Sequence, residues 1–379
     1  MIIKSYFERY SSNSLAGSSN QYFFTLKKGE VKTGRVFYKI FCEGEYNYSF
    51  LFSNILDSTY ADGEKSHCNL LCREWKIWGA RVGVAQIPAS NKEVTKLVLS
   101  EVDLAKSDIS VFCWQTVLFN GKKEKEVQIG EVFVSDPLTL RFKKGEYLCV
   151  ELTYSGQMIP YHEEITLPTF VKSDFEWKYS RCMPIPNMIG CDRNVRKKIG
   201  FLGDSITQGI GVKGNSYLHW NALFAEQLGT DYAFWNLGIG YGRAGDVASD
   251  GIWLKKAMQN DVVVVCLGVN DLCQGGNAMQ IKANLEFIAQ SLKEAGKKVV
   301  MQTVPPFNYN EKIRKEWMEV NRFIIEELSK KVDFLFDVVP ILQESDSAPH
   351  VAKFGGHPNK EGNALWAQAL YKKWKVKKF

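Results

Sequence analysis

Val262-Val263-Val264-Val265-Cys266-Leu267 is a run of six apolar residues in the second half of the chain. A strand that is apolar on both faces is typical of a parallel sheet with helices on either side, because each face then packs against a helix. Strand-like runs and helical stretches alternate around it from residue 197 onward. The sequence therefore predicts an α/β domain over 197–379 with a doubly wound, flavodoxin-like parallel sheet of five strands.

The predicted strands of this sheet are short and apolar, and helices lie between them. Strands are expected at Lys198–Leu202, Tyr232–Leu237, Asp261–Leu267, Lys298–Thr303 and Asp333–Val338. The clearest helices are expected at Ala278–Ala295, Lys312–Lys331 and Glu361–Trp374. Ligands of such sheets bind outside the carboxyl ends of the strands, so functional residues are expected directly after the strands.

The first half of the chain has the pattern of an all-β domain. Turn signals such as Asn120-Gly121 separate its short runs, and many short strands at this spacing are typical of a β-sandwich or jelly roll, expected over 1–180. The strand-like runs include Val36–Phe41, Tyr48–Phe52, Lys76–Trp78, Val94–Leu99, Ser110–Trp114 and Tyr147–Leu152. The stretch 181–196 carries prolines, a glycine and charges without periodicity, so it is predicted to be a linker.

Length, charge and cysteine usage exclude several classes of protein. A chain of 379 residues suits two domains. The formal net charge is +6, but basic and acidic residues are interleaved and no base-reading motif accompanies them, so no nucleic-acid partner is expected. No apolar run reaches the about 18 residues of a membrane span, and the first residues lack an apolar core and a cleavage site, so we expect no secretion signal. Nine cysteines without a repeated spacing predict a reducing cytoplasmic location.

His67-Cys68 and Cys72 are the one segment that invites a metal-site interpretation. They offer three possible ligands within six residues, but no second pair follows at zinc-finger spacing. Structural zinc normally takes four ligands. We therefore expect neither a metal site nor a cofactor.

Gly203-Asp204-Ser205 follows the first predicted strand of the α/β domain. A serine on the tight turn from strand to helix can hold its hydroxyl out of the sheet edge, as a nucleophile must be held. A serine there can also simply cap the following helix. The motif is short, so on its own it decides little.

The next two predicted strands end in Asn236-Leu237-Gly238-Ile239-Gly240-Tyr241-Gly242 and in Gly268-Val269-Asn270-Asp271. Glycines allow a backbone N–H to approach a ligand closely, although a glycine-rich loop without a ligand is an equal alternative. The side-chain amide of Asn270 can donate to a developing negative charge. The alternative is that Asn270 or Asp271 caps the next helix.

His357 lies in Gly355-Gly356-His357-Pro358-Asn359-Lys360-Glu361-Gly362, directly before the last predicted helix. A seryl hydroxyl is barely ionised at neutral pH and needs an adjacent base. Imidazole, with an ordinary pKa of about 6.5, is the natural base. The chain has five histidines, which narrows the choice, but a lone histidine is more often structural than catalytic.

These four segments, in this order, resemble the four blocks of the SGNH (GDSL) hydrolase superfamily. The resemblance covers about 197–379 and rests on Gly-Asp-Ser-Ile-Thr, Gly-x-Asn-Asp and His-Pro-Asn-x-x-Gly. It implies a serine esterase without metal or cofactor, in which Ser205 is the nucleophile and His357 is the general base. The implied oxyanion hole combines the Ser205 N–H, a glycine N–H from the second block and the Asn270 side chain.

Two positions depart from the family pattern. Family members usually carry an Asp three residues before the histidine, where this chain has Phe354. Asp346 or a main-chain carbonyl could orient the imidazole instead, as in similar carbohydrate acetyl esterases that work with a Ser–His dyad. In the second block the usual spacing falls on Tyr241. A one-residue deletion would place Gly240 there, so Gly240 is the predicted donor, with Tyr241 and Gly242 as alternatives.

The β half is similar to a sandwich that precedes some esterase domains of this superfamily. The matching pieces are Phe52–Asn54, Trp78–Val82, Ser135–Leu138 and Lys144–Leu148. Its aromatic residues Trp75, Trp78 and Trp114 could stack on sugars, although packing in the core is the expected role.

Together these features predict an esterase that removes short acyl groups, acetyl above all, from sugars or oligosaccharides. Two alternatives stay open. One is a general carboxylesterase or lipase of the GDSL type, and the other is a carbohydrate-binding protein without catalytic activity.

Overall fold

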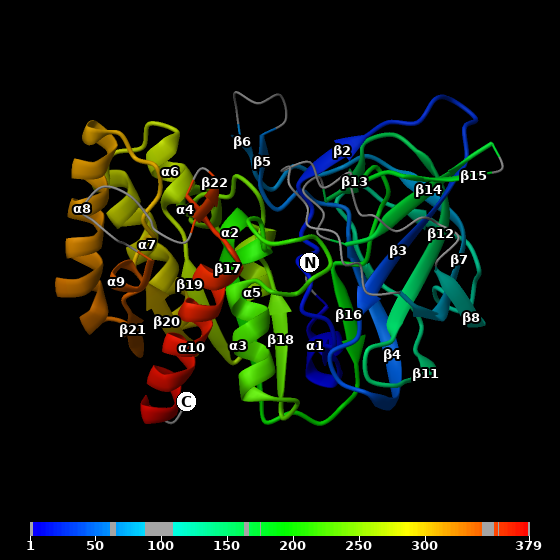
Figure 1. Cartoon of the computed structure of the whole chain (residues 1–379). Coiled ribbons are helices and arrows are strands. Elements are labelled where there is room, and N and C mark those ends of the chain that lie inside the picture. The colour runs from blue at the N-terminus through cyan, green and yellow to red at the C-terminus, as the bar shows by residue number, and fades with distance from the viewer. Residues whose placement is uncertain are drawn as a thin grey trace. The chain divides into compact units, whose positions relative to one another are not determined.

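The computed structural model describes residues 3–60, 66–87, 109–162, 167–174, 176–342, 352–354 and 356–377. The chain divides into two compact units, Met1–Val195 and Arg196–Phe379, and each is considered by itself (Figure 1). The predicted strand Val94–Leu99 lies outside the described residues.

The Arg196–Phe379 unit is built on a parallel sheet of five strands. Its strands are β17 (Lys197–Gly203), β18 (Tyr232–Asn236), β19 (Val262–Cys266), β20 (Lys298–Gln302) and β21 (Phe334–Phe336). They are arranged in the order β18-β17-β19-β20-β21. All residues of the central strand β19 are buried, as its two apolar faces require. The predicted doubly wound sheet is thus confirmed.

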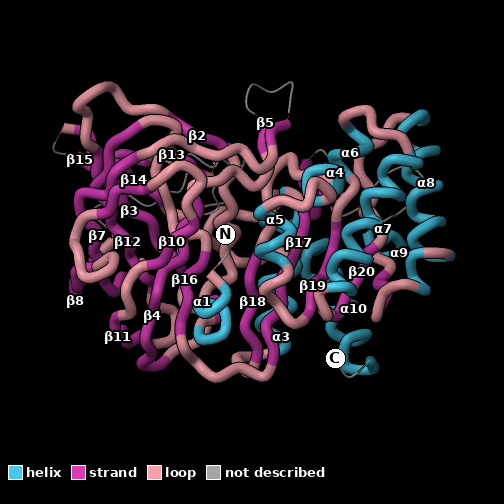
Figure 2. The backbone as a smooth tube through the Cα atoms, turned by 180° about the vertical axis from the view of Figure 1, so that it is seen from behind, coloured by secondary structure: helices cyan, strands magenta, loops and turns pink. Residues whose placement is uncertain are grey.

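Helices follow each strand of this sheet. They are α2 (Ser205–Gln208), α3 (Trp220–Leu228), α4 (Ala244–Val247), α5 (Ile252–Ala257), α6 (Val269–Cys273), α7 (Ala278–Glu294), α8 (Glu311–Glu326), α9 (Val339–Leu342) and α10 (Lys360–Lys377). Figure 1 shows α3 and α10 in front of the sheet, and the reverse view in Figure 2 shows α5 and α7 over the other face. The rings of Trp220 and Trp366 stack 4.9 Å apart between α3 and α10. The predicted helix Lys312–Lys331 is shorter than expected, because α8 ends at Glu326 and a 3-10 turn, Leu328–Lys330, follows.

The Met1–Val195 unit begins with helix α1 (Lys4–Arg9) and is otherwise made of antiparallel sheets. One sheet holds β1 (Ser11–Ser12), β16 (Met188–Cys191), β4 (Gly44–Ser53), β10 (Val132–Val134) and β11 (Leu138–Phe142). A larger sheet holds β15 (Glu176–Tyr179), β14 (Thr169–Ser173), β3 (Lys32–Lys39), β12 (Tyr147–Gly156), β7 (Trp75–Gln86), β8 (Ser110–Val117) and β9 (Lys125–Val127). Smaller pairs join β2 (Tyr22–Phe24) to β13 (Ile159–Tyr161) and β5 (Thr59–Tyr60) to β6 (Ser66–His67). The prediction of an all-β unit ahead of the α/β unit is confirmed.

Strand β16 corrects the linker prediction for 181–196. Met188–Cys191 is buried and pairs with both β4 and β1, so these residues complete a sheet of the β unit. The sequence pattern does not indicate this strand, because it is only four residues long and contains Gly190. That glycine is required by packing, since a Cβ there would lie 2.2 Å from the hydroxyl oxygen of Tyr6.

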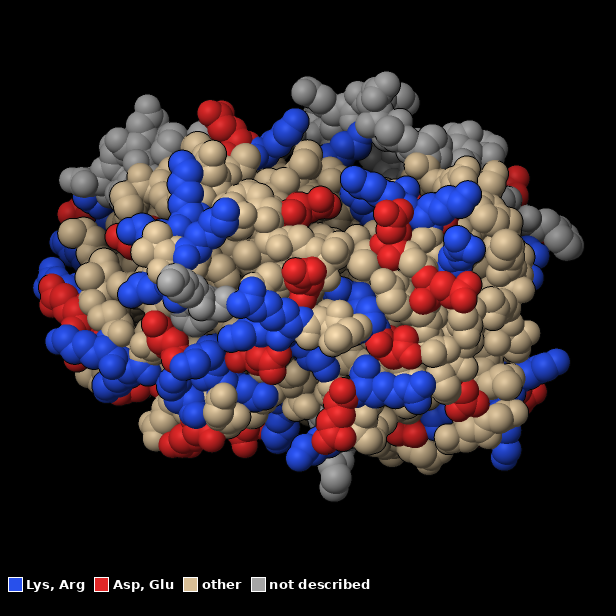
Figure 3. Space-filling model, turned by 90° about the horizontal axis from the view of Figure 1, so that it is seen from below, with Lys and Arg blue, Asp and Glu red and all other residues tan. Residues whose placement is uncertain are grey.

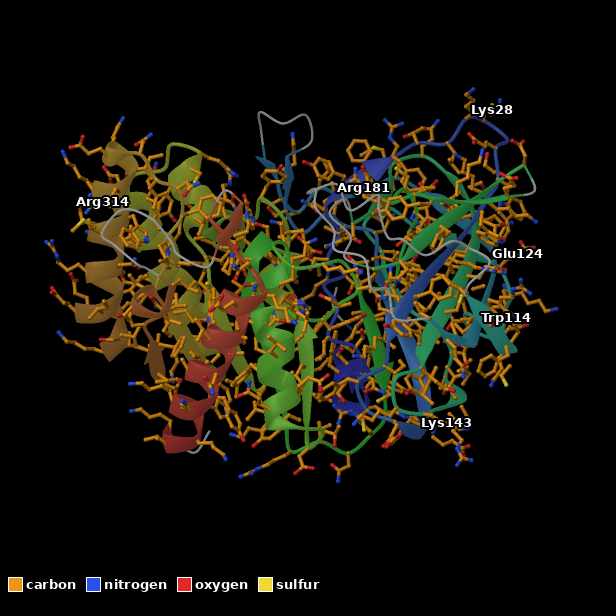
Figure 4. All side chains as sticks on the ribbon, in the orientation of Figure 1. Lys28, Trp114, Glu124, Lys143, Arg181 and Arg314 are labelled. Atoms are coloured by element: carbon orange, nitrogen blue, oxygen red, sulfur yellow. The ribbon has the colours of Figure 1, made fainter. Side chains whose placement is uncertain are left out.

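The three tryptophans named as possible sugar-stacking residues differ in burial. Trp75 is buried, and its Nε1–H donates to Asn54 Oδ1 at 2.9 Å, so it belongs to the core. Trp78 is 43% exposed. Trp114, labelled in Figure 4, is half-buried on β8, with the guanidinium groups of Arg35 and Arg81 over its ring. Core packing therefore holds for Trp75 and not for the other two.

Charged side chains of both signs share the surface. On the face seen in Figure 3, acidic side chains lie among the basic ones. None of the helices in the described part of the chain is both long enough and apolar enough to cross a bilayer.

Candidate active site

Ser205 is the first residue of α2. Asp204 alone separates it from the end of β17. Asp204 is the N-cap, and its Oδ1 accepts the N–H of Ile206 at 3.0 Å. The cap is thus the aspartate, and the interpretation of Ser205 as a helix cap is wrong. The Oγ of Ser205 instead lies 2.8 Å from Nε2 of His357, and both residues are half-buried. The structure brings this pair together across 152 positions of sequence.

His357 is held in place by its neighbours in the fold. It lies on β23 (His357–Pro358), whose partner strand is β22 (Ala352–Phe354). The imidazole packs edge-on against the ring of Phe307, with centroids 5.2 Å apart. Gly211 has a φ of +105°, and a Cβ there would lie 2.4 Å from the carbonyl oxygen of Pro358 and 3.1 Å from Cβ of His357. Only glycine fits so close to His357. No motif in the sequence signals Phe307 or Gly211.

The residues after His357 fix it to the start of α10. Asn359 Oδ1 accepts the N–H of Gly362 at 2.9 Å, which closes the first turn of the helix. Asn363 Nδ2 donates to the carbonyl of Pro358 at 2.8 Å. The Oδ1 of Asn363 accepts the N–H of Trp220 on α3 at 2.7 Å. The motif His-Pro-Asn-x-x-Gly thus joins His357 to α10, and Asn363 joins that helix to α3.

Asn236 connects the end of β18 to α2. Its Nδ2 donates to the carbonyl of Thr207 at 3.1 Å, and its Oδ1 accepts the N–H of Gly238 at 2.9 Å. A Cβ on Gly238 would lie 2.2 Å from the backbone nitrogen of Gln208. Gly238 is therefore required by close packing against the backbone of Gln208, and not by the approach of a ligand.

Ile239–Gly242 forms a tight turn beyond Asn236. The N–H of Gly242 donates to the carbonyl of Ile239 at 3.1 Å, so Gly242 is ruled out as the oxyanion donor because its N–H is already used. Tyr241 has a φ of +61°, a conformation that costs a non-glycine residue about 1–3 kcal/mol, and is 45% exposed. Gly240 is buried. Gly240 as the donor, with Tyr241 as its alternative, stays a prediction.

Asn270 and Asp271 lie side by side on α6, and neither caps that helix. The Nδ2 of Asn270 donates to the carbonyl of Gly242 at 3.0 Å. The carboxylate of Asp271 accepts the N–H of Ala244 at 2.8 Å and that of Gly245 at 3.2 Å. Both side chains therefore reach across to the segment after β18, and the capping alternative is wrong.

Asp271 is 7% exposed. Burial raises its pKa from 3.8 to about 6, although the N–H groups of Ala244 and Gly245 offset part of the rise. The folded protein therefore binds this proton more tightly than the unfolded chain does. The resulting stabilisation is present in full below about pH 4 and is lost as the pH rises through about 6.

We expect this titration to appear in the stability of the protein. A shift of about two pKa units corresponds to about 3 kcal/mol. Between about pH 4 and about pH 7 the unfolding free energy of the wild type should fall by about that amount relative to Asp271→Asn, which lacks the titrating group. Urea denaturation of both proteins across this range measures the difference. Parallel pH curves for the two proteins would contradict the expectation.

One candidate residue lies outside the described residues, and one further histidine of the chain is buried in the Met1–Val195 unit. Asp346, the possible partner of the imidazole, lies outside the described residues. His162 is fully buried, which lowers its pKa to about 4, and its Nδ1 contacts the carbonyl of Ser19. Within the described residues, no group of three or more His, Cys, Asp and Glu side chains is arranged to hold a metal ion.

Comparison with known proteins identifies the α/β unit. Residues 201–365 match the GDSL-like Lipase/Acylhydrolase family. A search of curated proteins finds no match. Similar solved structures include a member of the lipolytic protein G-D-S-L family from Veillonella parvula DSM 2008, with 18% identity over 47% of this chain and 98% of that chain and a TM-score of 0.41.

Two further solved structures are each similar to about half of the chain. One is a psychrotrophic esterase from Pseudoalteromonas sp., with 21% identity over 47% of this chain and 98% of that chain and a TM-score of 0.36. The other is a carbohydrate esterase family 3 protein from Talaromyces cellulolyticus, with 20% identity over 48% of this chain and 98% of that chain and a TM-score of 0.37.

The family match spans the segments that carry Ser205, Asn270 and His357. The fold of the unit and the order of its segments agree with that match. The C-terminal half of this chain is a GDSL (SGNH) hydrolase domain, of the class of lipases, acylhydrolases and esterases, and a β-rich N-terminal region precedes it.

Proposed function

We propose that the protein hydrolyses short-chain esters, in particular acetyl esters of sugars or oligosaccharides, through an acyl-enzyme on Ser205. The observation that carries this proposal is the 2.8 Å contact between Ser205 Oγ and His357 Nε2. A seryl hydroxyl becomes a nucleophile when a base lies within hydrogen-bond distance, and imidazole is suited to that role near neutral pH.

In the proposed reaction His357 accepts the hydroxyl proton while Ser205 Oγ attacks the ester carbonyl carbon. The carbonyl oxygen becomes an oxyanion in a tetrahedral intermediate. His357 then returns the proton to the departing oxygen, which leaves as the free hydroxyl of the sugar. Water attacks the acyl-serine while His357 takes its proton, and that proton returns to Ser205 Oγ as the carboxylic acid leaves.

The oxyanion would be stabilised by the N–H of Ser205, the N–H of Gly240 and the side chain of Asn270. A side-chain amide carries two N–H donors. One N–H of Asn270 donates to the carbonyl of Gly242, which fixes the orientation of the amide. The second N–H is then the donor offered to the developing negative charge.

Tyr241 supports the sugar part of the proposal. It follows Gly240 directly and keeps an exposed aromatic ring in a strained backbone conformation, where asparagine or glycine would cost less. Strain of this kind is concentrated at ligand-binding positions. An exposed ring next to the oxyanion donor provides a flat apolar surface of the kind on which sugar rings stack.

Substrate comparison tests this function against its alternatives. We expect kcat/KM for p-nitrophenyl acetate to exceed that for the octanoate by at least about tenfold, because an acyl site that fits acetyl would exclude the longer chain. Acetate release would then be compared on acetylated xylan, mannan and peptidoglycan fragments. Preference for octanoate would favour a lipase instead. Failure of the folded protein to react with a fluorophosphonate would favour a binding protein without activity.

A further inference from the structure

Asp271 links two segments that carry the proposed oxyanion donors. It lies on α6, next to Asn270, and its carboxylate accepts two N–H groups from the first turn of α4. Those groups have no partner within their own helix, because the first turn of any helix leaves its N–H groups unsatisfied. A carboxylate suits the position because it only accepts hydrogen bonds.

The bonds of Asp271 lie just beyond those of Asn270 along the same segment. Asn270 holds the carbonyl of Gly242, and Asp271 holds the N–H groups of Ala244 and Gly245. Between these points, the N–H of Arg243 donates to Asp246 within α4 at 3.1 Å. The backbone that follows Gly240 is thus fastened to α6 on both sides of Arg243.

We propose that Asp271 is a positioning residue for the oxyanion hole, which holds the 242–245 backbone against α6 and thereby aims the second N–H of the Asn270 amide at the oxyanion. This inference rests on the proposed function. Asp271 itself makes no contact with the substrate in this arrangement. Its effect passes through Ala244 and Gly245 to Gly242, and from Gly242 to the amide of Asn270.

The burial of Asp271 argues against a purely structural cap. Burial raises its pKa, which means that the ionised carboxylate is destabilising where it lies. Exposed asparagines cap other helices of the same unit, Asn277 on α7 and Asn310 on α8, with no buried charge. A carboxylate in a costly position is better explained by the geometry it imposes on the neighbouring segment.

The first test compares Asp271→Asn with Asp333→Asn. The amide places an N–H₂ group against a backbone N–H, so one of the two hydrogen bonds to α4 is lost. We expect kcat on p-nitrophenyl acetate to fall about 10- to 100-fold while KM stays within about threefold, since a misplacement of about 1 Å costs such factors. Asp333 also holds a backbone N–H, that of Val299, but at the amino end of the sheet, so Asp333→Asn should leave both constants within about threefold.

A double-mutant cycle with Asn270→Ala distinguishes an effect of Asp271 through Asn270 from an independent loss of activity. If Asp271 acts through Asn270, then Asp271→Asn should lower kcat by less than about threefold in the Asn270→Ala background. If the kcat of the double variant falls by the product of the two single-variant factors, the proposal is overturned. An unchanged kcat in Asp271→Asn alone would overturn it as well.

The unfolding midpoint of each variant is measured alongside. Should Asp271→Asn fail to fold, Asp271→Ser takes its place, because the hydroxyl keeps one acceptor for α4 in a smaller side chain. If neither variant folds, the role is structural and the proposal is overturned. A wild type without esterase activity would instead refute the proposed function, so the two failures are distinguishable.

Discussion

Ser205→Ala is expected to lower kcat on p-nitrophenyl acetate by about 10⁴- to 10⁶-fold, because removal of the nucleophile leaves only binding and oxyanion stabilisation. The hydroxyl does not cap α2, since Asp204 does so. The variant should therefore fold as the wild type does, with an unfolding free energy within about 0.5 kcal/mol. Labelling by a fluorophosphonate should disappear as well.

The matched control is Ser329→Ala. Ser329 is half-buried, and its hydroxyl donates to the carbonyl of Ile325 at the end of α8, away from the sheet edge that carries Ser205. This control should keep wild-type kcat and full labelling. Undiminished hydrolysis in Ser205→Ala would remove Ser205 from the mechanism and with it the acyl-enzyme.

Asn270→Ala should lower kcat about 10²- to 10³-fold, equivalent to about 3–4 kcal/mol of transition-state stabilisation, with little change in KM. The amide meets the negative charge only as the carbonyl oxygen becomes an oxyanion, so substrate binding is spared. Initial rates across a range of substrate concentrations separate the two constants.

Asn277→Ala provides the comparison for this variant. Asn277 caps α7 by accepting the N–H of Gln280 at 3.0 Å, and loss of such a cap costs about 1 kcal/mol of stability. We expect lower stability with unchanged kcat in that control. A rise in KM without a fall in kcat for Asn270→Ala would show that Asn270 binds the ground state instead.

The sheet and the main site pair could be predicted because each leaves a strong local pattern. The run of valines in β19 is apolar on both faces, which only a strand covered on both sides satisfies. The carboxyl ends of parallel strands meet at one edge, so Ser205 and Asn270 could be placed together from their positions after β17 and β19. The order of the segments along the chain, with His357 in the last one, then gave the resemblance to the superfamily.

What escaped prediction depends on contacts between residues far apart in sequence. Gly211 lies next to His357 only because the chain returns there 146 residues later, which no local pattern records. The hydrogen bond that uses the N–H of Gly242 depends on the turn at Tyr241, a residue that seldom adopts a positive φ. β16 was missed for a different reason, since four residues with a glycine carry too little periodicity to indicate a strand.

The stacked pair Trp220 and Trp366 has a practical consequence for engineering. Ser205 follows the first strand of the α/β unit and His357 precedes its last helix, so the contact between Ser205 and His357 forms only when α10 docks on α3. The unit is therefore suited to a split reporter, divided in the turn between Lys330 and β21. One fragment would carry the nucleophile and the other the base, and ester cleavage would report the reassembly of the two.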